Sequence, residues 1–429
     1  MDLVILIGSF FVMLFLGIPI AFTLCLSSIL YLVLYTNIPL IIVAQQLLKG
    51  VDSFTLLAIP FFVIAGCLMQ GGGISRRIVD FARKLVGWIP GGMAVVDIVA
   101  SMIFAAMTGA GAATTAAVGG IMIPYMEEDG YDPGFASAIQ TVGGVFGPII
   151  PPSILMVLYA VASNESVSDM LLAGLIPGLL LGLILLLAVV AQCIKKGYRG
   201  AGKFELGAAI KSFGHAFFAL LAPVIILGGI YSGKTTPTEA SAICCFYCLV
   251  IGLFVYREIK LKDVCKIVYG GVKSAAGIML IVAATQVFGW VITRAGIPQN
   301  IATMFTSSIS SPLMFMLSVV VILLVAGCFI DAVPALLIFA PIFCPTAQAY
   351  GINLVYFGVV MVIVLCIGLA TPPVGINLYV ASSVGGQPVH KIIPHLPIPL
   401  LAIFIGTMLV LLIPDIVIFL PNLMNGAAG

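Results

Sequence analysis

The sequence predicts an all-α membrane protein built from two inverted repeats, with two re-entrant helical hairpins and two broken transmembrane helices. Three observations support this fold class. Only 8% of the 429 residues are charged and 62% are hydrophobic, whereas a soluble domain carries about 25% charged residues. Several landmarks of the first half recur in the second half at a nearly constant shift. Each half also has a Pro-Pro pair inside an apolar run.

The apolar runs are long enough to cross a bilayer. The run Leu171–Cys193 carries no charge, and roughly 20 apolar residues span the hydrocarbon core. The ten cysteines show no metal-ligand spacing, so we expect them to pack in the interior rather than to form disulfides. No basic stretch precedes the apolar residues that begin at Leu3, so we expect a retained first span rather than a cleaved signal peptide.

An internal repeat defines the organisation of the chain. Gly73-Ile74 opens a helical pattern in the first half, and Gly296-Ile297 opens a similar pattern 223 residues later. Pro151-Pro152 and Pro372-Pro373 are 221 residues apart. Two weaker pairs agree with this shift, namely Pro19 with Pro237 and Pro177 with Pro399.

We expect five crossings in each half. They are residues 2–18, 19–36, 53–72, 134–163 and 166–194, followed by 216–232, 238–256, 273–293, 355–384 and 395–420. Between the third and fourth crossing of each half lies an apolar segment with a break, which predicts a re-entrant hairpin. The first hairpin is Gly91–Met126, broken at Thr108–Gly111, and the second is Met314–Gln348, broken near Gly327–Pro334. Because the number of crossings is odd, the second half is inverted in the membrane.

The distribution of basic residues gives the orientation. With the N-terminus outside, fifteen Lys and Arg residues fall on the inner face, and only Lys49, Lys234 and Arg294 fall outside. This bias satisfies the positive-inside rule. Two basic amphipathic stretches, Arg76–Trp88 and Lys262–Tyr269, are expected to lie along the inner interface; the alternative is that they are simple polar loops.

The two Pro-Pro breaks are candidate binding elements. Proline removes a backbone donor and clashes with the preceding turn, so Gly143–Ser153 and Gly368–Asn377 are expected to unwind locally. Non-helical backbone persists in a membrane only where it lines a cavity or is buried in protein. Freed carbonyls can coordinate a small cation such as Na⁺, and helix N-termini can face an anion. The alternative is a pair of structural kinks.

The hairpin tips carry the polar groups. Thr108–Thr115 is rich in small residues and hydroxyls, which suit a cation or a substrate carboxylate, although Thr114 and Thr115 are equally compatible with helix packing. Asp331 is the only carboxylate at either tip, and intramembrane carboxylates are costly and functional by default. Asp331 is suited to neutralise a cation, orient its hairpin or contact a substrate hydroxyl. A structural helix N-cap is the alternative.

Enzyme classes receive no support from the sequence. His215, His390 and His395 are widely spaced and form no metal-ligand set. The chain has no nucleophile motif, no phosphate-binding glycine loop and no ATPase signature. We therefore expect no catalytic residue and no nucleic-acid partner, and we expect energy to come from an ion gradient or from another subunit.

The motifs resemble those of the large membrane subunit of the tripartite ATP-independent periplasmic (TRAP) transporters. The residues that carry this resemblance are Gly-Pro-Ile-Ile-Pro-Pro-Ser at 147–153, Thr-Pro-Pro-Val-Gly-Ile-Asn at 371–377 and Thr-Gly-Ala-Gly-Ala-Ala-Thr-Thr at 108–115. The resemblance covers essentially the whole chain. The family in turn resembles the wider ion-transporter superfamily of elevator carriers.

The resemblance implies partners, ions and a site. The partners are a small four-helix membrane subunit and a periplasmic substrate-binding protein, which delivers a carboxylate such as sialic acid across a bacterial inner membrane. Two or more Na⁺ ions are implied. One would lie near Thr108, Gly109, Gly147, Ile150 and Pro151, and the second near Gly327, Gly368, Thr371 and Val374. The implied substrate-binding residues are Asp331, Thr114, Thr115, Ser153 and Asn377.

The same resemblance divides the chain into a scaffold and a mobile transport domain. Residues 1–90 are expected to form scaffold helices and the interfacial arm of the first repeat, and 91–165 the first hairpin and broken helix. Residues 166–312 are expected to form scaffold helices, an inner linker and the second arm, 313–386 the second hairpin and broken helix, and 387–429 a C-terminal scaffold helix. The transport domain would slide across the scaffold. The alternatives are a stand-alone Na⁺/dicarboxylate symporter and a channel.

Overall fold

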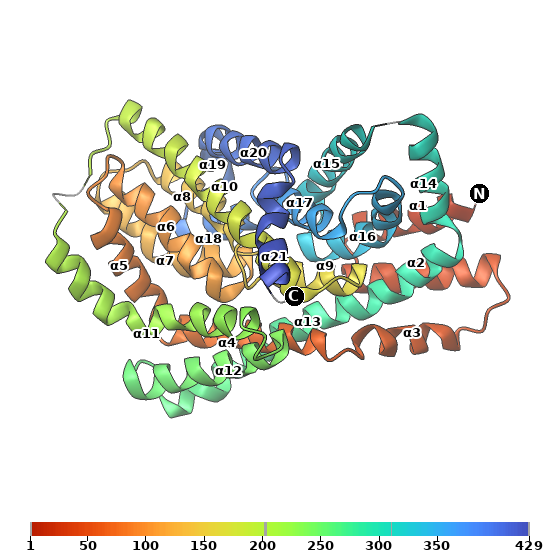
Figure 1. The fold of residues 1–429 in the computed structure, drawn as a ribbon, viewed down its shortest axis with the longest axis horizontal. Coiled ribbons are helices and arrows are strands. Elements are labelled where there is room, and N and C mark those ends of the chain that lie inside the picture. The colour runs from red at the N-terminus through yellow and green to blue at the C-terminus, as the bar shows by residue number, and fades with distance from the viewer. Residues whose placement is uncertain (1, 201–203, 310, 428–429) are drawn as a thin grey trace.

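The computed structural model describes residues 2–200, 204–309 and 311–427. Part of the predicted inner linker, residues 201–203, lies outside this description. The described residues form helices and connecting turns, without a β-strand (Figure 1). By length and composition, six of the described helices can cross a membrane, or eight if each of two bent pairs is one span. The expected all-α membrane protein is therefore confirmed.

The first half contains short spans, a bent pair, a helical hairpin and a broken helix. Its helices are α1 (Asp2–Phe15), α2 (Ile20–Tyr35), α3 (Ile41–Val51), η1 (Thr55–Leu57), α4 (Ala58–Gly71), α5 (Ile74–Val86), α6 (Gly92–Thr108), α7 (Gly111–Glu128), α8 (Pro133–Gly143), η2 (Gly144–Phe146), α9 (Ile154–Ser163) and α10 (Val167–Lys196).

The second half repeats the hairpin and the broken helix. Its helices are α11 (Leu206–Tyr231), α12 (Pro237–Val250), η3 (Ile251–Val255), α13 (Leu261–Arg294), α14 (Ile297–Ser308), α15 (Pro312–Phe329), α16 (Ala332–Ala349), α17 (Leu354–Gly368), α18 (Ile376–Gly385), α19 (Val389–Ile392), η4 (Ile393–His395), α20 (Pro397–Leu412) and α21 (Asp415–Ala427).

The sequence landmarks of the repeat become equivalent structural features. Gly73 and Gly296 have positive φ angles of 68° and 70° and precede α5 and α14. Both Pro-Pro peptide bonds are cis, and each lies between the two pieces of a broken helix. Figure 1 shows α6, α7 and α8 on one side of the molecule and α9, α15 and α16 on the other. The re-entrant path of the hairpins and the inversion of the second half across a membrane stay predictions.

Three predicted boundaries were wrong. The crossing at 53–72 omits α3, which forms with α4 a pair bent by 66°. Lys262–Tyr269 is not a separate amphipathic arm, because it is the start of the 34-residue helix α13, whose sequence contains no proline to end it. The crossing at 395–420 is two helices, since α20 ends at Leu412 and Pro414 separates it from α21.

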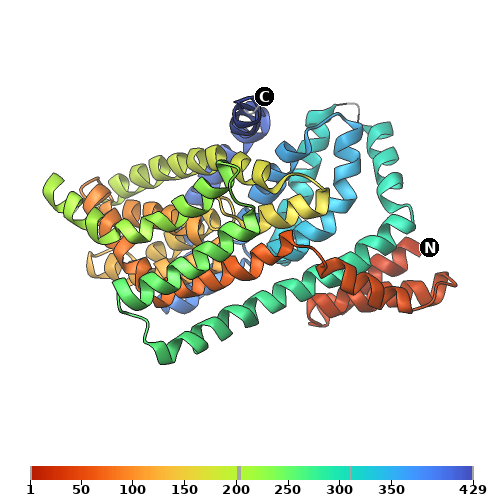
Figure 2. The same ribbon diagram turned by 60° about the horizontal axis from the view of Figure 1, so that its bottom comes forward.

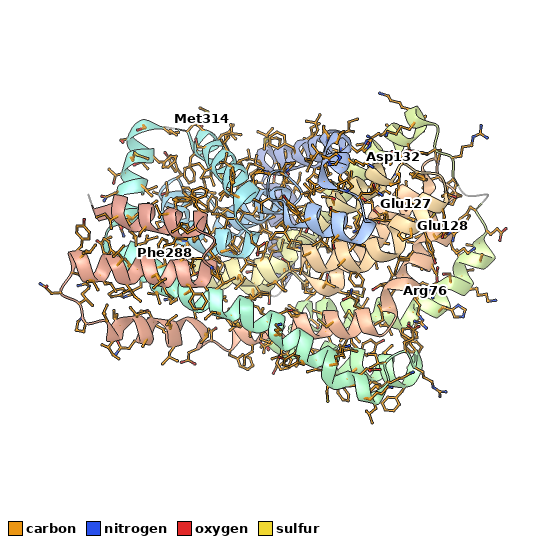
Figure 3. All side chains as sticks on the ribbon, turned by 180° about the vertical axis from the view of Figure 1, so that it is seen from behind. Arg76, Glu127, Glu128, Asp132, Phe288 and Met314 are labelled. Carbon is orange, nitrogen blue, oxygen red and sulfur yellow. The ribbon has the colours of Figure 1, made fainter. Side chains whose placement is uncertain are left out.

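Two helices show how the core and the periphery differ. All 15 residues of α17 are buried, as expected for a helix that is apolar on every side. By contrast, α13 runs along much of the length of the molecule (Figure 2) and contacts α2, α3 and α4. The charged residues Arg76, Glu127 and Glu128 lie near one end of the molecule, and Met314 lies toward the other (Figure 3).

Candidate functional site

Both hairpin tips and both helix breaks meet at one cavity of about 150 Å³. The two halves of the sequence contribute to it in the same way. The lining comprises Gly109–Ala112 from the first tip, Pro148, Ile154 and Leu155 from the first break, Asp331–Val333 from the second tip, Leu369, Ile376 and Asn377 from the second break, and Ile278 of α13. The repeat therefore predicts which segments come together.

Four helices begin at this cavity. The first residues of α7, α9, α16 and α18 are Gly111, Ile154, Ala332 and Ile376, and all four line it. The first turn of a helix has backbone N–H groups without intrahelical acceptors, and its dipole is positive at that end. Four such ends around one space create an electrostatic environment that favours an anion.

The first tip contacts the first break through glycines. A Cβ atom on Gly109 would lie 2.7 Å from the carbonyl oxygen of Pro152, and one on Gly147 would lie 2.5 Å from that of Ala110. Gly109 also has a positive φ angle of 63°, which side-chain-bearing residues rarely adopt. The N–H group of Ile154 donates to the carbonyl of Gly109 at 3.4 Å. Glycine is therefore required at both positions.

The second tip contacts the second break in the same manner. A Cβ atom on Gly368 would lie 2.6 Å from the Cα atom of Gly327, so the two backbones touch. The N–H group of Val374 donates to the carbonyl of Cys328 at 3.1 Å. The hydroxyl of Thr371 donates to the carbonyl of Ile367 at 2.7 Å. Gly327, Gly368, Thr371 and Val374 thus lie at this contact between tip and break and are not among the residues that line the cavity.

The threonines of the first tip have different environments. The hydroxyls of Thr108 and Thr114 are 3.0 Å apart, and Thr114 donates to the carbonyl of Ala110 at 3.0 Å. These two hydroxyls therefore hold the tip closed. The hydroxyl of Thr115 is fully buried and has no hydrogen-bond partner among the described residues.

Asn377 is another buried polar residue without a hydrogen-bond partner among the described residues. Neither its amide oxygen nor its amide nitrogen has a hydrogen-bond partner among the described residues, and the side chain is fully buried. Thr115 and Asn377 converge at Gly144, where a Cβ atom would overlap the Thr115 hydroxyl and lie 2.9 Å from the Asn377 nitrogen. Buried polar groups are nearly always satisfied, so Thr115 and Asn377 are candidate contacts for a polar ligand or an ion.

Asp331 and Ser153 are helix N-caps. A side-chain oxygen of Asp331 accepts from the N–H group of Ala332 at 2.8 Å, and Asp331 also lines the cavity. Ser153 donates to the carbonyl of Pro148 and accepts from the N–H group of Met156. The structural N-cap considered for Asp331 is therefore present, together with access to the cavity. Ser153 is fully buried and already has two partners.

Ile150 and Pro151 lie in the first break beside α10. A Cβ atom on Gly178 would lie 2.9 Å from the side chain of Ile150. Residues 147–152 form turns and bends rather than a helix, so several of their carbonyls leave the helical pattern. Carbonyl and hydroxyl oxygens are the ligands that hard cations prefer, so the donor types of both breaks suit Na⁺.

Of the predicted site residues, Gly109, Asp331 and Asn377 are among the described residues that line the cavity, and the other lining residues were not predicted individually. Ile278 was not predicted, because no feature of the sequence distinguishes it from the other apolar residues of α13. Asp97 of α6 does not line the cavity, but it is fully buried, and both of its oxygens lack hydrogen-bond partners within the described part of the chain. A Cβ atom on Gly143 would lie 3.0 Å from the Ser101 hydroxyl and 4.0 Å from Asp97. The sequence feature that could have identified Asp97 is its position as a lone carboxylate within an apolar run.

The fold and the cavity define a multi-span membrane protein whose two hairpins and two broken helices meet at one cavity, with Asp331 and Asn377 as the polar side chains among the described lining residues. Comparison with known families identifies it further. Residues 7–417 match the model of the DctM component of the tripartite ATP-independent periplasmic transporters, and the chain belongs to this family.

Individual relatives agree along nearly the full length. The sialic acid TRAP transporter large permease of Vibrio cholerae is 39% identical, over 96% of this chain and 97% of the relative. The C4-dicarboxylate TRAP transporter large permease of Pseudomonas aeruginosa is 41% identical, over 92% and 93%. The 2,3-diketo-L-gulonate TRAP transporter large permease of Escherichia coli is 37% identical, over 94% and 95%. The expected family is confirmed, and the chain is a TRAP transporter large permease.

Proposed function

We propose that this permease takes up an organic acid by Na⁺-coupled secondary transport across the bacterial inner membrane. A periplasmic binding protein would deliver the acid, and a small membrane subunit would complete the transporter, with the N-terminus of the large subunit on the periplasmic side. The observation that carries the proposal is the convergence of four helix N-termini on one cavity. This arrangement favours a carboxylate.

The cavity also supplies a reason for coupling to a cation. Asp331 lines the same 150 Å³ space, and its carboxylate repels a substrate carboxylate held nearby. A cation bound at the tips and breaks offsets this repulsion. Na⁺ bound to carbonyls of the two breaks would therefore raise the affinity for the acid, and the acid would raise the affinity for Na⁺, since such coupling is reciprocal.

The substrate class is an organic acid, and the relatives limit it no further. Relatives of similar identity are named for sialic acid, C4-dicarboxylates and 2,3-diketo-L-gulonate. Sialic acid therefore remains one candidate among several. Thr114, Thr115, Ser153 and Asn377 are the proposed substrate contacts beside Asp331; of these, Thr115 and Asn377 have the unpartnered polar atoms.

We propose that transport follows an elevator movement. The hairpins α6–α7 and α15–α16 and the broken helices α8–α9 and α17–α18 would form the mobile domain, and the remaining helices with the small subunit would form the scaffold. Only Ile278 of the cavity lining comes from the proposed scaffold. A cavity at this boundary can change its exposure when one domain slides along the other.

Reconstitution tests the proposal. The complex with its small subunit and binding protein is placed in liposomes, and uptake of labelled sialic acid, C4-dicarboxylates and diketogulonate is measured. We expect uptake of at least one acid, only with an inward Na⁺ gradient and only with the binding protein. Uptake by the large subunit alone would support a stand-alone symporter, and uptake insensitive to Na⁺ would indicate a channel.

A further inference from the structure

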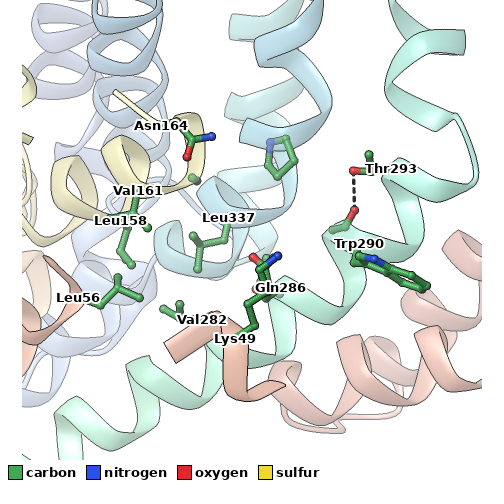
Figure 4. A pocket seen from close by; sticks show the side chains of 15 residues that line it. Lys49, Leu56, Leu158, Val161, Asn164, Val282, Gln286, Trp290, Thr293 and Leu337 are labelled. Atoms are coloured by element: carbon green, nitrogen blue, oxygen red, sulfur yellow. Dashed lines mark hydrogen bonds between the residues drawn. The ribbon is translucent and has the colours of Figure 1, made fainter. Parts of the chain in front are cut away.

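A second, larger cavity lies beside the central one. It has a volume of about 440 Å³ and is lined mainly by residues of α3, α9, α13 and α16 (Figure 4). Small-molecule sites commonly measure about 300–1,000 Å³, so this cavity accommodates an organic acid more readily than the central cavity of about 150 Å³ does.

Three helices, α9, α13 and α16, line both cavities. On α9 the lining passes from Ile154 and Leu155 in the central cavity to Leu158 in the larger one, and on α16 it passes from Val333 to Leu337. On α13 it passes from Ile278 to Val282. Four residues correspond to about one helical turn. The larger cavity therefore begins about one turn beyond the central cavity on each of the three helices.

The larger cavity has a positive charge and a polar wall. Lys49 is its one charged lining residue, and the lining contains no aspartate or glutamate. Lys49 is exposed and has no ion-pair partner among the described residues. Gln286 of α13 supplies a side-chain amide on one side, whereas the hydroxyls of Thr285 and Thr293 donate to the carbonyls of Ile281 and Gly289 in the same helix. Figure 4 shows Lys49 and Gln286 close together.

Gly50 brings α3 against α13 at this point. A Cβ atom on Gly50 would lie 2.7 Å from the Cβ atom of Gln286 and 3.1 Å from the Cα atom of Ala283. The backbone of α3 therefore contacts α13 directly, and Lys49 is held next to Gln286. The charge distribution of the sequence predicts that Lys49 lies on the outer side, from which the binding protein would deliver the substrate.

We propose that this cavity is a staging site that captures the organic acid before it reaches the central cavity. The ammonium group of Lys49 attracts the carboxylate, and the side-chain amide of Gln286 hydrogen-bonds the polar groups that follow. The proposal rests on the proposed function, since it names the route to the same central site. A single cationic group at the mouth of a cleft raises the local concentration of an anionic substrate.

Lys49→Gln separates capture from translocation. In proteoliposomes that contain the whole complex, we expect this variant to raise KM about fivefold with little change in maximal rate, because loss of a rim charge chiefly slows capture. Lys49→Arg keeps the charge and is expected to behave nearly as the wild type. The difference between Lys49→Gln and the wild type should shrink at high salt, because salt screens exposed charges.

Two controls make the result specific. Lys234→Gln removes another predicted outer charge that does not line the cavity, and its KM should stay unchanged. The affinity of the Lys49→Gln complex for the binding protein should also be unchanged. An unaltered KM for Lys49→Gln, or a KM increase that is accompanied by weaker affinity for the binding protein, overturns the staging site. Absence of Na⁺-dependent uptake in the wild type would instead refute the proposed function.

Discussion

Asp331 combines two tasks that the sequence presents as alternatives. It caps α16 through the N–H group of Ala332, and it lines the central cavity. A carboxylate is unnecessary for capping alone, because Asn and Ser cap helices about equally well. The negative charge at this position therefore suggests a role beyond the cap, which we assign to binding of the coupling cation.

Substitution of Asp331 tests this assignment. Asp331→Ala should abolish or sharply reduce uptake without loss of assembly with the small subunit. Asp331→Asn retains a capping side chain but lacks the charge, so it should assemble normally and also lose Na⁺-dependent uptake. Uptake at the wild-type level in Asp331→Ala, measured in proteoliposomes with equal amounts of protein, would remove Asp331 from the mechanism.

Individual site residues were only partly predictable. Thr114 and Thr115 are adjacent and chemically identical, yet the hydroxyl of Thr114 is hydrogen-bonded to Ala110 whereas that of Thr115 has no partner among the described residues. Their difference arises from the helical rotation between neighbouring residues, which turns Thr115 toward Gly144 and Asn377. The amino-acid sequence identifies the residue types at the tip, but it does not show that Thr115 lies close to Gly144 and Asn377.

At the level of elements, glycines set the contact between each tip and its break. Gly327 of α15 and Gly368 of α17 touch through their backbones. Their close approach determines the positions of the nearby backbone carbonyls. The resemblance assigns the second Na⁺ site to this same junction. Loss of this contact should therefore affect ion binding as well as stability.

The substitution Gly368→Ala tests whether this backbone contact supports ion binding. Its new methyl group would lie 2.6 Å from the Cα atom of Gly327, and overpacking of this kind typically costs about 1–3 kcal/mol. We expect a lower thermal unfolding midpoint and a higher Na⁺ concentration for half-maximal uptake. Gly277→Ala in α13 is the control, since a Cβ atom there meets nothing within 4 Å. An unchanged Na⁺ dependence in Gly368→Ala would argue against a cation site at this contact.

The elements were predicted best where proline and glycine set their limits. Both hairpin breaks and both Pro-Pro breaks lie within the predicted segments. The errors concern α3, which is bent against α4, α13, which has no internal proline, and α21, where Pro414 was overlooked as a helix boundary. Lys262–Tyr269 is basic and amphipathic by itself, but no proline interrupts the chain between it and Arg294, so it continues as one helix.

At the scale of the whole molecule, α13 is the element against which movement would occur. It packs on α2, α3 and α4 and also contacts α16. It lines both the central cavity, through Ile278, and the larger cavity beside it. The repeat in the sequence predicts that the tips and breaks meet. It does not predict that α13 closes the cavity, because α13 shows no motif and its counterpart in the first half is divided into α3 and α4.

We propose that the hairpins and broken helices move relative to α13 during transport. Ile278 and Val333 line the cavity from opposite sides of this boundary, so the pair Ile278→Cys and Val333→Cys, in a background without the ten native cysteines, can be joined by a cleavable thiol cross-linker. The single-cysteine variants treated with the same reagent are the controls. We predict that Na⁺-dependent uptake falls in proportion to the cross-linked fraction and returns when the linker is cleaved. Undiminished uptake by fully cross-linked protein would contradict the proposed movement of the hairpins and broken helices along α13.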